Sequence, residues 1–194
     1  MKKNLLTAIW MTLATTALLG VLYPLAITGL ARLIFPRQAN GGLIQAGGET
    51  IGSSLIGQAF SSPGYFRSRP SAAGAAGYDA DASGGGASNF APTSQALITR
   101  VKGDVQNAQA ENPNAKVPVD LVTTSASGLD PDITPASAEF QVPRVAKQRG
   151  MSEADVRGLV AKHTEGRQLG FLGEARVNVL ELNLALDAAH PMHR

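Results

Sequence analysis

The first part of the chain is apolar and carries no charge over a long stretch. No charged residue occurs from Leu5 to Ala31, which exceeds the roughly 20 residues that a helix needs to cross about 30 Å of hydrocarbon. A cleaved signal peptide is the alternative, because Lys2 and Lys3 precede the stretch, but the apolar part of such a peptide has about 7–15 residues. We therefore expect residues 1–36 to form a cytoplasmic tail and an uncleaved transmembrane anchor helix.

Three residues of this predicted anchor are candidates for helix packing. Gly20 and Gly29 permit a second helix to approach closely. Pro24 removes one backbone hydrogen bond and is expected to kink the helix. The three residues predict contact with a partner in the membrane, and the alternative is a harmless bend in a lone anchor.

After Pro36 the pattern changes to short apolar stretches separated by glycine. Residues 43–56 alternate around Gly47 and Gly48, which predicts a β-hairpin with a glycine turn. Residues 57–94 are so rich in glycine, serine, alanine and proline that we expect one long irregular loop. Loops of this length inside a compact domain are usually functional.

The middle of the body carries alternating helix and strand signals. A helix is predicted to end before Asn112, and the apolar residues of 117–124 predict a strand. Thr134 is expected to cap the next helix. We expect Pro143 to interrupt that helix and Gly150 to end it.

Two further elements complete the predicted domain. Ser152 is expected to begin a helix that ends at Gly166. Residues 176–189 can be interpreted as a strand from their alternating valines or as a helix from the spacing of their leucines, and we favour a short strand that turns into a helix capped by Asn178. The predicted fold is thus a single transmembrane helix followed by one mixed α/β (α+β) extracytoplasmic domain, residues 37–194.

The distribution of charge excludes a nucleic-acid partner. Lys2, Lys3, Arg32 and Arg37 all flank the apolar stretch, and without these four the chain has 13 basic and 15 acidic residues. A body of this composition lacks the basic face that a phosphate backbone requires. The short N-terminal tail is expected to stay in the cytoplasm, whereas long domains cross the membrane largely regardless of their charge.

The composition also gives little support to catalysis. The chain has no cysteine, which excludes disulfides, thiolate zinc sites and a cysteine nucleophile. Neither a G-x-S-x-G nor an H-E-x-x-H motif occurs. We therefore expect no catalytic residue and no metal site.

The first candidate contact site lies in the long loop and consists of Tyr65, Phe66, Arg67 and Arg69. Adjacent aromatic and arginine side chains can stack a base and bind phosphate, or they can anchor a protein partner. The alternative is a loop held in the core by its aromatic residues with solvated arginines. A protein partner is favoured over a nucleotide because the body is slightly acidic.

The second candidate site, Thr123, Thr124, Ser125 and Asp130, follows the predicted strand. Ligands of α/β folds bind beyond the carboxyl ends of strands, so these oxygen atoms can hold a hard cation or a small molecule. The safer interpretation is that they stabilise their own turns. The glycine tract that begins at Ser83 can offer backbone amides to an anion, but it lacks the lysine of a phosphate loop.

Five segments together resemble one known family. They are LIGQAF at 55–60, YFRSRPSA at 65–72, SGGGASNFAPTS at 83–94, VTTSASGLDPDITPASAEFQVPRVA at 122–146 and RVNVLELNLALD at 176–187. The chain resembles, essentially from end to end, the C subunit of the bacterial Kdp-type potassium-transporting P-type ATPase.

The resemblance implies a non-catalytic, single-pass subunit of the bacterial inner membrane, with a periplasmic domain and contacts to membrane lipid. Its implied partners are a potassium-channel-like subunit, the ATP-hydrolysing P-type subunit and a small fourth subunit, and potassium is the transported ion. The family role has been described as a catalytic chaperone that raises the ATP affinity of the pump subunit. That role would nominate Ser83, Gly84, Gly85 and Gly86, by analogy with the signature loop of ABC transporters.

Topology limits what this resemblance can mean. A domain outside the membrane does not reach ATP in the cytoplasm, so ATP is implied only through the pump subunit. Stabilising the complex, or guarding the periplasmic potassium entrance, is the physically easier role. The alternatives are a free-standing membrane-anchored periplasmic protein that binds a small molecule, and a nucleotide-binding regulator with the opposite orientation.

Overall fold

A computed structural model describes residues 2–75, 77–79 and 87–192. The chain divides into two compact units, residues 1–50 and 51–194. The division lies further along the chain than the predicted end of the anchor at residue 36. Each unit is described separately below.

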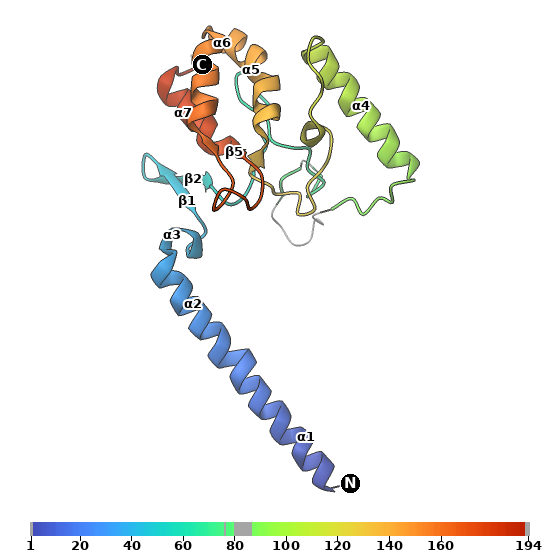
Figure 1. Ribbon diagram of the computed structural model, residues 1–194, viewed down its shortest axis with the longest axis vertical. Coiled ribbons are helices and arrows are strands. Elements are labelled where there is room, and N and C mark those ends of the chain that lie inside the picture. Colours follow the sequence, from blue (N-terminus) through green and yellow to red (C-terminus); the bar gives the residue numbers. More distant parts are fainter. Residues whose placement is uncertain (1, 76, 80–86, 193–194) are drawn as a thin grey trace. The chain divides into compact units, whose positions relative to one another are not determined.

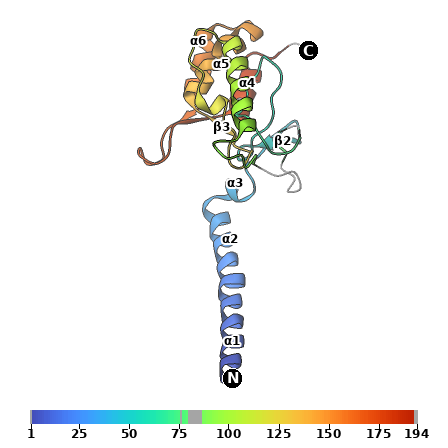
Figure 2. The ribbon, with the colours of Figure 1, turned by 90° about the vertical axis from the view of Figure 1, so that its right-hand side faces the viewer.

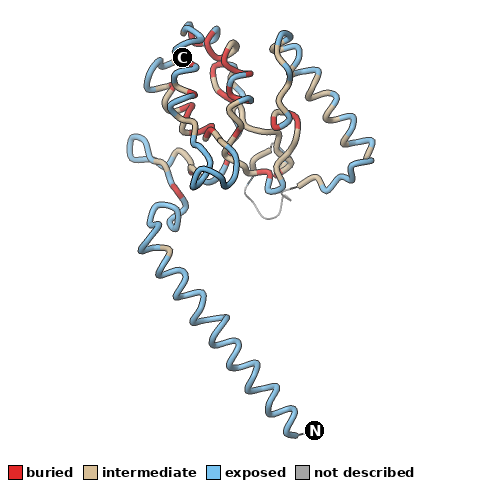
Figure 3. The backbone as a smooth tube through the Cα atoms, in the orientation of Figure 1, coloured by how far each residue is buried: buried red, intermediate tan, exposed pale blue. Residues whose placement is uncertain are grey.

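The N-terminal unit is dominated by one apolar helix. It runs through Lys2–Ile34 and, among the described residues, is the one helix long and apolar enough to cross a membrane. Its parts are α1 (Lys2–Thr15), a π-helical segment (Thr16–Leu22) and α2 (Tyr23–Ile34). None of its described residues is buried, as Figure 3 shows by the pale blue of this helix.

The helix continues through Pro24 without a break (Figure 1). Pro24 has no N–H to donate to the preceding turn. The π-helical segment comes just before it, and the N–H of Tyr23 bonds the carbonyl of Leu18, five residues back. The backbone thus adapts to the missing donor by widening one segment of the helix.

The rest of this unit leads into a hairpin whose second strand extends beyond residue 50. A short helix, α3 (Pro36–Ala39), precedes β1 (Leu43–Ala46) and β2 (Glu49–Ser53), which form a two-stranded sheet. Gly47 and Gly48 have φ angles of 61° and 87°. Two successive positive φ values are what a tight two-residue hairpin turn requires, so the predicted hairpin is confirmed.

The second unit combines helices with a small antiparallel sheet. Its strands lie in the order β3-β5-β4, and Val177 of the central strand pairs with both Ile133 and Thr164. The elements are α4 (Gln95–Glu111), β3 (Asp132–Ile133), α5 (Pro135–Arg149), α6 (Glu153–Lys162), β4 (Thr164–Glu165), β5 (Arg176–Asn178) and α7 (Val179–Ala189). This mixture of helices and antiparallel strands confirms the predicted α+β composition.

The core of this unit lies among α5, α6, α7 and β5. Figure 3 shows buried backbone concentrated in these helices, whereas α4 has no buried residue. One aromatic ring from the long loop, Phe66, is fully buried in the same cluster. The cluster is otherwise aliphatic and includes Val142, Val145, Val156, Val177, Leu182 and Leu186.

Local sequence signals place most helix ends correctly. The side chains of Thr134, Ser152 and Asn178 each accept a hydrogen bond from a backbone N–H three residues on, which is the N-cap contact expected of these residue types. Gly150 ends α5 at φ 65°. The strand-to-helix interpretation of residues 176–189 is confirmed.

Two predicted helix boundaries are wrong. Pro143 lies inside α5, which continues to Arg149. The N–H that proline lacks would have bonded the carbonyl of Glu139, which is an exposed residue, and buried residues on both sides of Pro143 pack the helix into the core. The helix from Ser152 ends at Lys162 and not at Gly166, because Thr164 and Glu165 join the sheet as β4.

The strand predicted at 117–124 is also wrong. The segment forms a 3₁₀ turn, Val119–Leu121, that contains the buried Asp120. The carboxylate of Asp120 accepts hydrogen bonds from the backbone N–H of Thr134, at 2.8 Å, and from the hydroxyl of Ser137. Because this contact requires a turn that directs Asp120 at the start of α5, the tertiary interaction overrides the local apolar pattern.

Candidate functional site

The two predicted contact stretches lie together in the structure, joined by Arg69. Its Nη1 is 2.9 Å from Asp130 Oδ2. Its Nε and Nη2 donate to the carbonyls of Thr123 and Thr124, at 3.4 and 3.5 Å. All three partners of Arg69 come from the second stretch, so this side chain fastens the long loop to residues 123–130.

A second set of contacts in the same place depends on glycine. The N–H of Gly57 donates to the carbonyl of Leu129 at 2.8 Å, and the hydroxyl of Ser71 donates to the carbonyl of Gly128 at 2.7 Å. A Cβ atom on Gly57 would lie 2.6 Å from the carbonyl oxygen of Asp130. The two loops therefore touch so closely that residue 57 has no room for a side chain.

Tyr78 packs against this contact between the long loop and residues 128–130. Its hydroxyl donates to the carbonyl of Arg69, and its ring lies where a side chain on Gly57 would be. Burial raises the pKa of Tyr78 to about 12, and the charge of Asp130 acts in the same direction. The phenol is thus held in its neutral form, in which it can donate.

The backbone around Phe66 and Arg67 is bonded by two buried amide side chains. Asn183 of α7 accepts from the N–H of Phe66 at 2.8 Å and donates to its carbonyl at 2.9 Å. Gln141 of α5 makes the same pair of bonds with Arg67, at 2.8 and 3.1 Å. Each amide therefore satisfies one residue of irregular backbone completely, as a neighbouring strand would do in a sheet.

Two arginines of α5 hold Gly64 and Tyr65, the residues that precede Phe66. The side chain of Arg149 is fully buried and pairs with Asp187 at 2.9 Å. It also donates to the carbonyl of Gly64 at 2.6 Å and lies 4.8 Å from the centre of the Tyr65 ring, a cation–π distance. Arg144 donates to the carbonyl of Tyr65 at 2.9 Å and pairs with Glu111 at 2.6 Å.

These contacts show where the first predicted site lies. Phe66 is in the core and presents no ring face for stacking. Tyr65 is covered by Arg149, its hydroxyl donates to Asp187 at 2.9 Å, and burial raises its pKa. Arg67 has a side chain 43% exposed and pairs with Glu111. The interpretation as a loop held by its aromatic residues fits this geometry, and contact of these residues with a partner stays a prediction.

The second predicted site follows a 3₁₀ turn and not a strand, so the expected placement at a strand end is wrong. Its polar groups form bonds within the loop. The hydroxyl of Thr123 donates to the carbonyl of Val119 at 2.8 Å, and Asp130 accepts from the N–H of Asp132 at 3.1 Å. Ser125 lies 3.5 Å from Ser127. These are the contacts of residues that stabilise their own turns.

A cavity of about 350 Å³ lies against the long loop. Arg67, Ser68 and Arg69 line it, together with Tyr78. Both arginines are paired with carboxylates, Glu111 and Asp130. The positive charge at this cavity is therefore already compensated within the chain.

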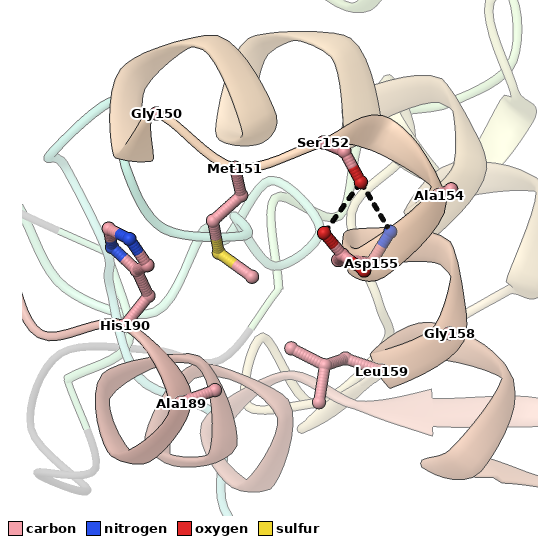
Figure 4. A pocket seen from close by; sticks show the side chains of 9 residues that line it. All are labelled: Gly150, Met151, Ser152, Ala154, Asp155, Gly158, Leu159, Ala189 and His190. Carbon is pink, nitrogen blue, oxygen red and sulfur yellow. Dashed lines mark hydrogen bonds between the residues drawn. The ribbon is translucent and has the colours of Figure 1, made fainter.

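Another cavity, of about 590 Å³, lies between the end of α5, the start of α6 and the end of α7. Figure 4 shows Met151 and Leu159 pointing into it, with His190 at one side. The hydroxyl of Ser152 bonds the carboxylate and the N–H of Asp155, at 2.6 and 3.1 Å. These polar groups form the cap of α6, and none of the candidate site residues predicted from the sequence lines the cavity.

The remaining predicted residues lie in two other places. Ser83, Gly84, Gly85 and Gly86 fall outside the described residues. Gly20, Pro24 and Gly29 lie on the exposed apolar helix. A Cβ atom on Gly29 would meet nothing within 4 Å in this chain, and one on Gly20 would meet Thr16 at 3.7 Å.

Comparisons with known proteins agree with the segments named above. Residues 5–188 match the family described as "K+-transporting ATPase, c chain". The chain belongs to the KdpC family.

Several relatives are similar over nearly their whole length. The potassium-transporting ATPase KdpC subunit of Koribacter versatilis is 62% identical over 192 residues, which covers 99% of this chain and 98% of the relative. The KdpC subunit of Acidobacterium capsulatum is 60% identical over 96% of this chain and 99% of its own. That of Rhodopseudomonas palustris (strain BisB18) is 58% identical over 97% and 100%.

Within this KdpC-family chain, sequence reasoning missed the residues that hold the loop. Gln141, Arg149 and Asn183 are buried polar residues on helices whose inward positions are mostly apolar. A polar residue at an apolar position of a helical repeat was the available signal, since such groups need partners when buried. What the sequence did not contain was the identity of those partners.

Substitution of Asn183 tests the role of the buried amides. Asn183→Ala leaves the N–H and carbonyl of Phe66 without partners in the core, so we expect a loss of about 2–4 kcal/mol in the free energy of unfolding. Denaturant titration of the full chain in detergent measures this loss. Asn107→Ala, on the exposed side of α4, is the matched control and should change little. Equal stability of the two variants would contradict the proposed role.

The raised pKa of Tyr78 predicts that the stability of the fold depends on pH in the alkaline range. A tyrosine of the unfolded chain loses its proton near pH 10, whereas Tyr78 keeps its proton until its pKa of about 12. Between these values the unfolded state binds fewer protons, so stability that is fully present below pH 10 falls as the pH rises through 12. Tyrosinate absorbance of the folded chain should show a late phase that Tyr78→Phe removes, and a titration unchanged by this substitution would refute the assignment.

Proposed function

We propose that this chain is a non-catalytic accessory subunit of a potassium-transporting ATPase. It is held in the inner membrane by one helix and stabilises the assembly of the channel-like and ATP-hydrolysing subunits, together with the small fourth subunit. The observation that carries the proposal is the match to the KdpC family over residues 5–188, which includes both the apolar helix and the body. The named relatives are themselves KdpC subunits of such an ATPase.

The apolar helix supports a role within an assembly. It has 33 residues, and its large apolar side chains are exposed, including Leu18, Leu25 and Leu30. Such a surface requires lipid or other helices around it. The room above Gly20 and Gly29 suits close helix packing, in which small residues let backbones approach.

The positions of these glycines indicate more than one contact direction. Gly20 and Pro24 are four residues apart, close to one turn of a helix. Gly29 follows Gly20 by nine residues, which is about two and a half turns of a regular α-helix. The wider π-helical segment that contains Gly20 changes this phase by only part of a turn, so Gly29 still lies on a different side. We infer that the helix contacts a partner subunit on one side and lipid or a second subunit on another.

The body supports a scaffolding role because its polar residues are engaged with the fold. Arg69, Arg144 and Arg149 all form ion pairs within the chain. Among the described residues, no group of three His, Asp or Glu side chains is arranged to hold a metal ion. The paired arginines of the body thus position its loops and helices.

We place residues 37–194 on the periplasmic side, with the N-terminus in the cytoplasm. The slight excess of acidic residues in this part of the chain favours cations in its surroundings, which suits a position over the potassium entrance. A domain on that side does not reach cytoplasmic ATP. Any increase in ATP affinity would therefore act through the conformation of the pump subunit.

Removal of the anchor tests the assembly role. With all subunits co-expressed, a chain that lacks residues 2–36 should no longer co-purify with the larger subunits, because the packing surface on the helix is lost. A chain whose helix is replaced by an unrelated transmembrane helix of the same length is the matched control for membrane attachment alone. Native mass spectrometry of the purified sample shows which subunits are present. Full ATPase activity with the truncated chain would contradict the proposal. A chain that purifies alone in its intact form would favour a free-standing binding protein.

Orientation has its own test, which uses the absence of cysteine from the chain. Lys102→Cys on the exposed part of α4 and Lys3→Cys at the N-terminal end of α1 each introduce one thiol. On spheroplasts, a membrane-impermeant maleimide should label position 102 and not position 3, because only the body faces outward. Lysed cells are the control, in which both positions should react. The reverse pattern would support a regulator that faces the cytoplasm.

A further inference from the structure

The connection between β4 and β5 ends in a narrow tip that projects from the rest of the second unit (Figure 2). Gln168 and Leu172 exchange two backbone hydrogen bonds of 2.9 Å. Two more bonds tighten the turn, from the N–H of Gly170 to the carbonyl of Arg167 at 3.1 Å and from the N–H of Phe171 to that of Gln168 at 3.2 Å. The turn therefore has a defined hydrogen-bonded geometry.

The side chains of this turn are apolar and exposed. Leu169, Phe171 and Leu172, here called the apolar tip, are 82%, 69% and 48% exposed. A single exposed leucine is common on protein surfaces, but three large apolar residues gathered in one projecting turn indicate an interaction site. Leu169 also has φ 53°, a conformation that glycine and asparagine adopt more readily than leucine. A turn that needed only to be soluble would not require leucine there.

Ion-paired residues form the base of the apolar tip. Arg167 Nη2 lies 2.7 Å from both carboxylate oxygens of Glu174. Arg176, further from the tip, pairs with Glu165 at 2.7 Å and with Asp132 at 3.2 Å. An apolar end above a charged base is the arrangement of segments that enter the interface of a membrane, where Phe and Leu side chains lie among the acyl chains and charged groups stay in the headgroup layer.

The chain also keeps a membrane within reach of this unit. Only residues 35–50 separate the end of the apolar helix from the second unit. Even fully extended, a stretch of this length spans at most roughly 60 Å. A weak contact gains greatly when its two partners are tethered, because the second binding event becomes intramolecular.

We propose that the apolar tip inserts into the interfacial layer of the lipid bilayer that holds the N-terminal helix of the same chain. This inference rests on the anchor of the proposed function and adds a second, reversible contact with lipid. The residue types favour lipid over a pocket in a partner protein. Energetic centres of protein interfaces are enriched in Trp, Tyr and Arg, whereas Leu is under-represented, and the apolar tip consists of two leucines and one phenylalanine.

The experiment uses the full chain reconstituted in phosphatidylcholine vesicles. Because the chain has no cysteine, a nitroxide on Leu172→Cys is its only label, and it leaves Leu169 and Phe171 in place. Power-saturation EPR compares the collision of the label with oxygen, which concentrates in the bilayer, and with a nickel chelate, which stays in water. We expect the oxygen-to-nickel ratio at position 172 to exceed severalfold the ratios at two exposed control positions, Val119→Cys and Lys102→Cys.

Two further labelled proteins make the result specific. In the Leu172-labelled chain, Leu169→Asp together with Phe171→Asp should return the label to water, because charged side chains do not enter hydrocarbon. Ile98→Asp, another exposed apolar position, should leave the label in lipid. Replacing part of the lipid by an anionic one should change little, because the arginines at the base are paired.

A label at Leu18→Cys separates failure of the tip from failure of the anchor. Contact with oxygen at position 18 but with nickel at position 172 would overturn the proposal and leave the anchor intact. Contact with nickel at both positions would refute both the insertion of the apolar tip and the membrane anchor. A third outcome concerns the larger subunits. The label at position 172 could be in water with the chain alone and become shielded from both reagents only when the larger subunits are added. That result would assign the apolar tip to a protein pocket and would also overturn insertion into lipid.

Discussion

The folded structure of the second unit depends on one requirement: buried backbone outside helices and strands must have hydrogen-bond partners. The ring of Phe66 belongs to the core, and it brings with it a backbone segment that belongs to no sheet. An unpaired N–H or carbonyl in such a place is costly. Asn183 and Gln141 remove this cost for two successive residues, because each side chain accepts one hydrogen bond from the backbone of the loop and donates one to it.

The same requirement explains why charged groups are buried beside the core. Arg149 is fully covered, yet its guanidinium meets the carbonyls of Gly64 and His190 and the carboxylate of Asp187. A buried charge is tolerated when it is paired and its hydrogen bonds are satisfied. The loop, α5 and α7 are therefore joined through polar contacts as well as through apolar packing. The segment from Gly64 to Arg67 is thus held in place by groups of the same chain.

The features that the sequence predicted correctly are local ones. The N-caps at Thr134 and Asn178 and the glycine turn of the hairpin depend on residues within a few positions of one another, so their chemistry can be recognised in the sequence. The turn at Asp120 and the continuous helix through Pro143 depend on residues far along the chain or on packing around them. The ion pair of Arg69 and Asp130 joins two stretches that were nominated separately. Their composition marked both as unusual, but it did not show that each is the other's partner.

The widened segment before Pro24 affects how the whole apolar helix must be viewed. Each π-helical turn contains more residues than an α-helical turn, so it shifts the angular phase of α2 relative to α1. A helical wheel drawn with one uniform period from Lys2 to Ile34 would assign side chains beyond Leu22 to the wrong sides. One side of α1 therefore need not continue as the same side of α2, and a single helix can turn α1 toward one neighbour and α2 toward another.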